Sequence, residues 1–319
     1  MLIENPKTYK GTEVEQIFFR PSFCGQNAEQ LGIRVIYNMP MPTTVHVWGS
    51  ADNVLQSFES GWSGGASSHK LQKTIQMHKV KAESSFSAEE YFSMIFEKMV
   101  GANGVGYQDL TGTELEKAET ELFRQAIAEG VRSTMWIGDT SGEISNLKTF
   151  DGFFRHILDA GANISRFEIS SEDEMMGAIE TLKRCWYQAS DELKALRSEG
   201  QLVYFVSSSI YNQYIEELDQ MGVEGAYNDI INGHATLHYH GIPVVEVPLT
   251  NYDVEKFSHF CLLVDRRNMV LALNTADMPE NEVRMWYNPD MMENRQRAVF
   301  LAGADIIDQR LISAVYSSF

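Results

Sequence analysis

The sequence predicts an α+β fold in which a long polar hairpin comes first, helices follow, and strands dominate the rest of the chain. Alternating apolar residues on both sides of a glycine-rich stretch predict the hairpin in residues 33–83. Capping residues and apolar stripes with helical spacing predict the helices. From residue 202 onward the chain is mostly strand with one inserted helix, so the regular alternation of a doubly wound parallel sheet is missing.

The composition is that of an ordinary globular protein. The chain has 319 residues, of which 44% are apolar and 22% are charged, and this length accommodates one large domain or two medium ones. Its 44 acidic and 26 basic residues give a formal net charge of −18. A protein that grips nucleic acid through many phosphates needs a strongly basic surface, so this charge argues against sequence-specific DNA or RNA binding.

No segment of the sequence predicts export or membrane insertion. The N-terminus mixes both charges without the apolar core of a signal peptide, and no apolar run approaches transmembrane length. The three cysteines, Cys24, Cys185 and Cys261, have neither metal-binding nor disulfide spacing. We therefore expect reduced thiols in a cytoplasmic protein.

The hairpin is predicted in two halves that meet at a tip. In the first half, residues 33–49, Pro40 and Pro42 cannot donate backbone hydrogen bonds, so any strand there lies at an edge or is broken. Residues 69–83 return in rough alternation. Both faces are too polar to bury a core, so the hairpin needs another surface to lie on. The tip contains Gly61, Gly64 and Gly65.

Helices are predicted at 87–101, 111–130, 171–193 and 208–222. A capping box opens each of the first two, and Gly101 and Gly130 end them. The second helix has one apolar and one strongly charged face, so we expect it to lie over a sheet with one side in water. Its apolar face consists of Leu115, Ala118, Leu122, Ala126 and Ile127.

Strands account for most of the remaining chain. The run at 202–207 is apolar throughout, as in a buried strand, and it leads directly into the last predicted helix. The other predicted strands are 235–240, 242–248, 259–265, 268–274, 282–287, 297–307 and 311–317.

Three histidines within seven positions raise the question of a metal site. His238 and His240 alternate along a predicted strand and so share one face, with His234 in a turn. Such a pair needs a third ligand, and neither a CxxC nor an HExxH motif supplies one. A half-exposed strand face is the favoured interpretation, and a metal-dependent enzyme that uses these three histidines is the alternative.

Other candidate motifs also have plainer interpretations. The glycines of residues 101–106 follow a helix end, whereas a phosphate-binding loop lies between a strand and a helix. The serines at 207–209 lack the flanking glycines of a nucleophile elbow and are interpreted as a helix N-cap. The Met-rich segment 289–296 is either a contact surface or a turn with partly buried methionines. No catalytic constellation or cofactor site emerges, so we do not predict an enzyme.

The order of these segments resembles the Hong Kong 97-type major capsid proteins of tailed double-stranded DNA bacteriophages. The best local match is the strand 202–207 and the helix 208–222, followed by HYHGIPVVEVP at 238–248, where family members carry a GxPV turn. Gly241 permits a backbone turn that a side chain would block, and Pro243 fixes the entry into the next strand.

The resemblance implies a Hong Kong 97-type fold in five parts. These are an N-terminal arm at 1–32, an extended E-loop hairpin at 33–83, a peripheral domain with a long spine helix at 84–150, an axial domain at 151–285 with strands returning to the peripheral domain, and C-terminal strands of the peripheral domain at 286–319. It also implies residues at which subunits meet: Gly61, Trp62, Gly64, Gly65, Leu115, Leu122, Gly241 and Pro243.

The resemblance further implies a structural subunit of an icosahedral phage or prophage head. Such subunits assemble into pentamers and hexamers in the bacterial host cytoplasm and enclose double-stranded DNA by non-specific contact. The implied partners are other copies and separate scaffolding, portal and decoration proteins, with no cofactor and no membrane. Encapsulin-type nanocompartment shells share the fold and are the first alternative function.

Overall fold

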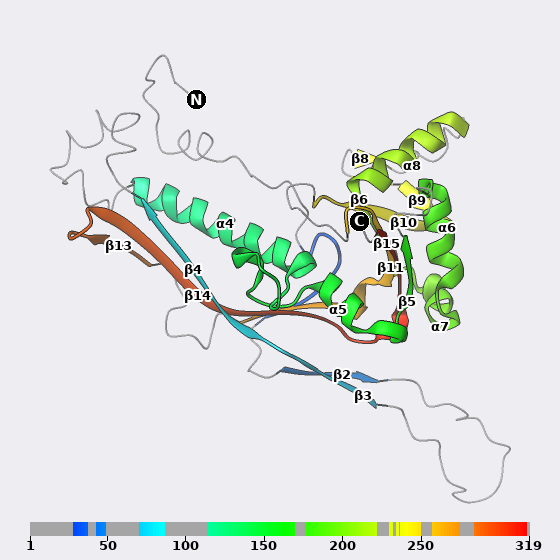
Figure 1. The fold of residues 1–319 in the computed structure, drawn as a ribbon, viewed down its shortest axis with the longest axis horizontal. Coiled ribbons are helices and arrows are strands. Elements are labelled where there is room, and N and C mark those ends of the chain that lie inside the picture. The colour runs from blue at the N-terminus through cyan, green and yellow to red at the C-terminus, as the bar shows by residue number, and fades with distance from the viewer. Residues whose placement is uncertain are drawn as a thin grey trace, which may run out of the picture.

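The computed structural model describes residues 28–37, 43–48, 70–86, 114–169, 176–221, 230–231, 234–235, 237–249, 257–274 and 284–317. In this part of the chain, an elongated sheet with one long helix along it adjoins a six-stranded sheet with helices on both faces (Figure 1). The mixture of helices and strands expected from the sequence is therefore confirmed. None of the helices in these ranges is long and apolar enough to cross a bilayer.

The elongated sheet is built around its longest strand, β14 (Glu293–Ile306). β4 (His78–Phe86) pairs along one edge of β14, and β12 (Met269–Asn274) and β13 (Arg284–Asn288) share the other edge. β1 (Arg34–Tyr37) adds to β12 in parallel. The order across the sheet is therefore β1, β12, β14 and β4, with β1 and β4 at opposite edges.

The predicted hairpin is present in its inner part. β2 (Thr43–Trp48) and β3 (Lys70–Ile75) pair in antiparallel register and project beyond the elongated sheet (Figure 1). The flanking segments do not pair with each other as the sequence suggested, because β1 and β4 join the elongated sheet instead. Ile33 and Val80, which lie in these flanking segments, are buried in the main core. Two strands that projected as a free hairpin could not bury these side chains.

The long helix α4 runs from Glu114 to Ile137, so the predicted end at Gly130 is wrong. Gly130 does not end the helix because a side-chain hydrogen bond and buried side chains stabilise the turn that follows it. The Thr134 hydroxyl donates to the Gly130 carbonyl at 2.7 Å, and Met135 and Trp136 are fully buried beneath the helix. Burial of two large side chains outweighs the cost of about 1 kcal/mol for an interior glycine.

The apolar face of α4 also differs from the predicted one. Phe123 is buried, and Ile127 and Val131 pack against the main core at successive i+4 positions. Ala126 is exposed and Leu122 is only half-buried. The stripe that meets the sheet therefore lies one residue further along the helix than the sequence pattern suggested.

The six-stranded sheet has the order β5-β15-β11-β6-β10-β9. Its strands are β5 (Ser165–Ile169), β15 (Ile312–Ser317), β11 (Phe260–Asp265), β6 (Leu202–Ser207), β10 (Ile242–Val247) and β9 (Leu237–Tyr239). The sequence predicted each of these strands except β5, and those predictions are confirmed. Residues 286–319, expected as one group, divide between the sheets, because β15 pairs with β11 and β5 while β14 belongs to the elongated sheet.

Alternate residues of the central strands pack into two separate hydrophobic cores, one on each face of the sheet. Val203 and Phe205 of β6 face the main core, whereas Tyr204 and Val206 face the second core under α6 and α8. The main core continues into the elongated sheet and joins the two sheets. Trp136 is central to it, with its ring 5.4 Å from those of Phe153 and Phe205.

The helices over the six-stranded sheet are α5 (Phe153–Asp159), α6 (Ala178–Gln188), α7 (Asp191–Ala195) and α8 (Ser208–Met221). The predicted single helix at 171–193 is corrected to α6 and α7, since the helix breaks at Ala189 and the Ser190 hydroxyl caps the next one. The short remaining elements are η1 (Ser145–Leu147), η2 (Gly161–Asn163), η3 (Leu196–Glu199), η5 (Arg266–Asn268), η6 (Gln309–Leu311), β7 (Ile230–Ile231) and β8 (His234–Ala235).

Candidate functional site

His238 and His240 do not share one strand face, contrary to the expectation from the sequence. His240 lies in the turn after β9, with φ at +52°, rather than on the strand face with His238. The side chain of His234 lies outside the described residues. No group of three His, Cys, Asp or Glu side chains within the described ranges could hold a metal ion.

The turn after β9 explains the glycine at 241. His240 and Gly241 both have positive φ, at +52° and +77°, so they form a two-residue turn of the type that suits a twisted hairpin. Arg197 donates to the His240 carbonyl and holds this turn. Pro243 precedes Val244, where pairing between β10 and β6 begins, so its missing N–H costs no ladder hydrogen bond.

A serine–histidine contact lies where β6 enters α8, which the sequence did not reveal. The Ser209 hydroxyl lies 2.5 Å from Nδ1 of His259 and 2.9 Å from the Ser207 hydroxyl. The Phe260 amide donates to Ser207, so this network joins the start of α8 to β11. Within the described ranges no carboxylate contacts His259, as a hydrolytic triad requires, and we interpret the network as structural.

The root of the hairpin is fixed on the face of the elongated sheet that lies away from α4. Val45 of β2 and Ile75 of β3 are buried against Val270, Ala272 and Leu301 of that sheet. This small core anchors the two strands, and their described ends project beyond the elongated sheet.

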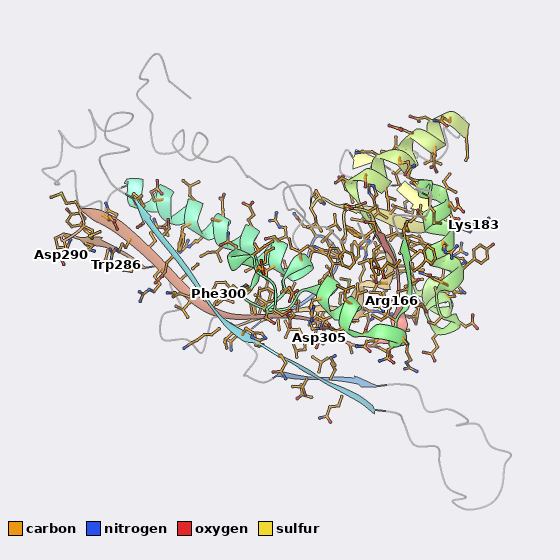
Figure 2. The ribbon with its side chains drawn as sticks, viewed as in Figure 1. Arg166, Lys183, Trp286, Asp290, Phe300 and Asp305 are labelled. Atoms are coloured by element: carbon orange, nitrogen blue, oxygen red, sulfur yellow. The ribbon has the colours of Figure 1, made fainter. Side chains whose placement is uncertain are left out.

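A buried carboxylate ties the root to the rest of the molecule. The Asp305 carboxylate on β14 forms an ion pair with Lys73 on β3, with Oδ1 lying 3.2 Å from the lysine Nζ. The same oxygen lies 3.8 Å from Nδ1 of His156 on α5. The Ile306 amide donates to the same carboxylate at 2.7 Å, and Nε2 of His156 contacts the Ala304 carbonyl at 2.8 Å. Side chains of β3 and α5 therefore meet a carboxylate on β14, although the three elements are distant in sequence. Figure 2 labels Asp305 at this place.

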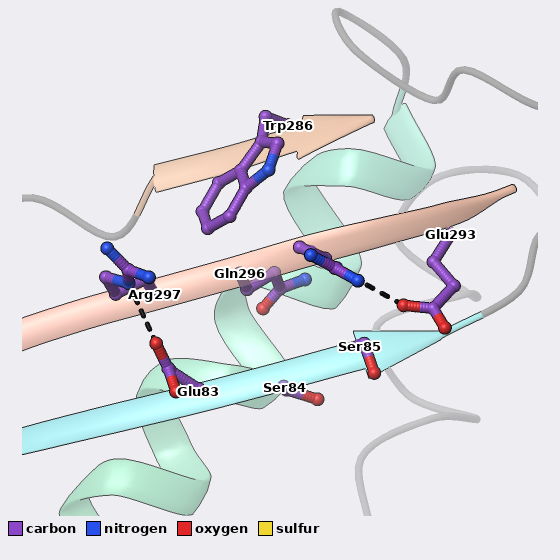
Figure 3. A pocket seen from close by; sticks show the side chains of 8 residues that line it. Glu83, Ser84, Ser85, Trp286, Glu293, Gln296 and Arg297 are labelled. Atoms are coloured by element: carbon purple, nitrogen blue, oxygen red, sulfur yellow. Dashed lines mark hydrogen bonds and ion pairs between the residues drawn. The ribbon is translucent and has the colours of Figure 1, made fainter. Parts of the chain in front are cut away.

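The far end of the elongated sheet carries a charged face. Trp286, Arg295 and Ser85 lie side by side in register, next to the pair formed by Arg297 and Glu83 at 2.9 Å (Figure 3). The hydrogen bond from Lys81 and the nearby Arg297 lower the pKa of the Glu83 carboxyl. These side chains line a shallow cavity of about 400 Å³.

Two methionines are exposed at the turn beyond this face. Met291 and Met292 join β13 to β14, and each is about 60% exposed. Met292 has φ at +54°, which is uncommon for a residue with a side chain. The segment begins with a turn, but its methionines are exposed rather than partly buried, and the contact surface stays a prediction. They therefore lie where another chain could contact them.

A second cavity lies between α6 and α8, on the outside of the six-stranded sheet. It measures about 780 Å³ and is lined by Lys183, Arg184, Tyr187 and Met221 among others. Glu217 of α8 borders it and accepts the Ala178 amide at 2.8 Å and the Ile179 amide at 2.9 Å. The start of α6 is thus capped by a residue from another helix.

The two thiols in the described ranges are buried and unlinked, as expected for reduced cysteines. Cys185 and Cys261 are fully buried in the second core. Burial raises the pKa of the Cys261 thiol, which makes it a poor nucleophile. Cys24 lies outside the described residues.

The residues expected at subunit contacts that the structure describes fall in two separate places. Gly241 and Pro243 lie at the β9–β10 turn of the six-stranded sheet, and half-buried Leu122 lies on α4 beside the elongated sheet. Leu115 is in the first turn of α4, but its side chain lies outside the described part. The tip residues Gly61, Trp62, Gly64 and Gly65 also lie outside the described residues.

Comparison with known proteins identifies relatives through structure. No protein-family model matches the chain, and no curated protein matches it by sequence. Solved structures do match over nearly the whole length. A chain of Gordonia phage Cozz has a TM-score of 0.56 and 11% identity, covering 99% of this chain and 92% of that one.

Two further structures match comparably well. A chain from the satellite phage P4 procapsid including size determination (Sid) protein has a TM-score of 0.55 and 11% identity, covering 95% of this chain and 88% of that one. A chain from the capsid of a native GTA particle has a TM-score of 0.54 and 12% identity, covering 99% and 96%. At this identity the likeness is one of fold, and it confirms the similarity in fold to phage capsid proteins that the sequence predicted.

Proposed function

We propose that this chain is the structural subunit of an icosahedral phage or prophage head. The observation that carries the proposal is the fold match to procapsid and capsid chains, which extends over almost the entire length of both partners. A match of that extent leaves little of the chain for a separate catalytic domain.

The exposed elements support a role in self-assembly. The hairpin of β2 and β3 is held at its root by a small core and the Lys73–Asp305 ion pair, yet it projects away from its own subunit. A projecting two-stranded ribbon is marginal alone and gains stability by packing on a neighbour. In the Hong Kong 97 scheme this ribbon is the E-loop, α4 is the spine helix and the six-stranded sheet is the axial domain.

In this proposal the subunits form pentamers and hexamers around the axial domain. The tip residues Gly61, Trp62, Gly64 and Gly65 contact one neighbour, Leu115 and Leu122 contact another, and the Gly241–Pro243 turn faces the capsomer axis. Many weak contacts repeated with closed symmetry give a stable shell.

The proposed shell encloses double-stranded DNA through confinement and non-specific contact. A net charge of −18 agrees with an inner wall that does not bind the phosphates tightly. Separate scaffolding, portal and decoration proteins are the expected partners, and the mature location is the virion capsid after assembly in the bacterial host cytoplasm.

The test is to express the full chain and measure particle mass by light scattering, with electron microscopy on the same fraction. Capsomer rings, tubes or closed shells support the proposal, and the experiment is repeated with the scaffolding gene of the same locus if the chain alone stays small. A chain that remains monomeric or dimeric in both settings contradicts it.

The same particles distinguish the alternatives. A shell that packages an enzyme and no nucleic acid identifies an encapsulin-type compartment rather than a phage head. Stoichiometric zinc in purified protein, lost on His238→Ala and His240→Ala, would identify the metal-dependent enzyme instead.

A further inference from the structure

Two cysteine side chains lie together in the second core, at the place where α6 packs on β11. Cys261 of β11 faces this core, whereas its neighbours Phe260 and Leu262 face the main core on the other side of the sheet. Cys185 comes from α6 and belongs to the same core. Both side chains are fully buried and carry free thiols. The two sulfur atoms therefore occupy one layer between a helix and a sheet.

Hydrogen bonds hold the Cys185 side chain against the sheet. Its Sγ lies 3.7 Å from the Cys261 carbonyl oxygen and 3.4 Å from the carbonyl oxygen of Ser313 on β15. The Ser313 hydroxyl donates in turn to the Cys185 carbonyl at 2.8 Å. Further along α6, the Gln188 amide donates to the Ala314 carbonyl at 2.9 Å. These bonds fix which face of α6 lies on the sheet, so the Cys185 sulfur points at the residue that carries the second thiol.

The two thiols are close enough to influence each other. Burial raises the pKa of the Cys261 thiol, and hydrogen bonding with the Cys185 thiol raises it further. Cα atoms of α6 and β11 approach within 8 Å of one another, and a disulfide spans Cα separations of up to about 7 Å. Joining the sulfur atoms therefore requires only a small movement of α6 toward the sheet.

Formation of a disulfide from two thiols requires a two-electron oxidant, and hydrogen peroxide is small enough to enter a core that opens briefly. One thiol gives up its proton and attacks a peroxide oxygen, so the O–O bond breaks and a sulfenic acid and water are formed. The second thiol then attacks the sulfenic sulfur, the S–S bond forms and a second water leaves. The raised pKa of Cys261 keeps its thiolate scarce at neutral pH, so we expect the oxidation to be slow.

We propose that Cys185 and Cys261 form an oxidation site, at which a peroxide closes a disulfide between α6 and β11 of one subunit. The two residues are 76 positions apart in the chain, and β6, α8, β9 and β10 lie between them. A cross-link over such a distance removes much of the conformational freedom of the unfolded chain. The oxidised subunit should therefore be more stable than the reduced one.

The setting for this reaction rests on the proposed function, whereas the oxidation site itself does not. A head subunit is made and assembled in the reducing host cytoplasm, where thiols stay free. Once the particle has left the cell, it meets oxygen-derived oxidants. The disulfide would therefore strengthen the subunit after assembly, and it would leave folding and assembly in the host unaffected.

Thiol counting in the full chain tests the site directly. Cys24→Ser leaves Cys185 and Cys261 as the two remaining cysteines of the sequence. After the folded protein has been incubated with hydrogen peroxide, unfolding in the presence of a maleimide should label no thiol. Proteolysis should then yield one pair of peptides that the two cysteines join. Retained thiols, oxygen added to either sulfur, or a link between two chains would overturn the inference.

Thermal unfolding measures what the bond contributes. The oxidised Cys24→Ser chain should melt roughly 5 °C above the reduced one, and a dithiol reductant should reverse the shift. Cys185→Ala and Cys261→Ala, each in the same background, cannot form the link, so peroxide should not raise their melting temperature. They also report any effect of methionine oxidation, which a dithiol does not reverse. An oxidised chain that melts at or below the reduced one would contradict the stabilising role.

Both measurements can be made on unassembled subunits, so they are separate from the test of the proposed function. Thiol counting needs no substitution in the core, and it decides the inference even if an alanine variant folds poorly. A link that fails to form overturns this inference and leaves the proposed function standing. A link that forms in a chain that never assembles supports the oxidation site and refutes the proposed function.

Discussion

At the scale of single residues, Gly303 shows how close the hairpin root approaches the elongated sheet. A Cβ at this position would collide with the carbonyl oxygen of Gln76, where the chain passes from β3 to β4. The colliding atom is backbone, so it cannot move aside without shifting the strands. Gly303 is therefore required for the crossing that places the hairpin, although it reads in the sequence as an ordinary glycine within a strand.

Gly303→Ala should lower the free energy of unfolding by about 1–3 kcal/mol, because an added methyl in a packed region forces the backbone apart. Urea denaturation followed by circular dichroism measures the change. Assembly should suffer as well, since the hairpin leaves its root in a different direction. Wild-type stability in this variant would show that the root is looser than the structure indicates.

Asp305→Asn tests the ionic tie at the same root. The substitution keeps the size of the side chain but leaves Lys73 without its partner, so we expect a loss of about 1–3 kcal/mol in unfolding free energy. Lys73→Met should weaken the root at least as much, because it leaves the Asp305 carboxylate, the more buried of the two charges, without the lysine ammonium. If both variants unfold like the original chain, the ion pair contributes nothing to the root.

At the scale of elements, the sequence predicted strands and helices better than their ends. The buried strands β6 and β11 and the helix α8 lie where their patterns indicated. The start of α6 could not be predicted, because the cap comes from Glu217, 39 residues away from Ala178. A local pattern identifies an element, but contacts distant in sequence decide where it begins and stops.

The continuation of α4 through Gly130 gives a quantitative prediction. A Cβ at Gly130 would meet nothing within 4 Å, and the residue sits in an otherwise regular helix. Gly130→Ala should therefore raise the unfolding free energy by about 0.5–1 kcal/mol through helix propensity and reduced freedom of the unfolded chain. It also serves as the matched control for Gly303→Ala, since the chemical change is the same. A destabilised Gly130→Ala would mean that the helix does not continue through this position.

At the scale of the whole molecule, the sequence predicted the class of fold and the projecting hairpin but not how the sheets are joined. The patterns of β14 and β15 look alike and follow one another in the chain, yet they belong to different sheets. The main core that connects those sheets draws Val80, Trp136 and Tyr316 from widely separated segments. Strand pairing over such separations depends on the whole set of buried faces, which no local window contains.

The candidate site was predictable to a similar degree. The GxPV turn was found from local residue types, and Gly241 has the positive φ that such a turn requires. The anchor at Asp305 was not found, because Lys73, His156 and Asp305 carry no shared spacing in the sequence. Contact surfaces made of exposed side chains are even harder to predict from the sequence, since exposed positions tolerate most polar residues.

Deleting residues 55–68 separates folding of the subunit from its assembly. The root contacts of Val45, Ile75 and Lys73 remain, and a shorter connection between β2 and β3 lowers the entropy cost of closing the loop. The variant should therefore unfold at the same urea concentration as the original chain, yet fail to form closed particles in electron microscopy. A second variant that fills 55–68 with glycine and serine keeps the reach and removes the side chains, so its failure would assign the contact to the tip residues. An unfolded deletion product, or normal particles from it, would contradict a tip that contacts neighbouring subunits.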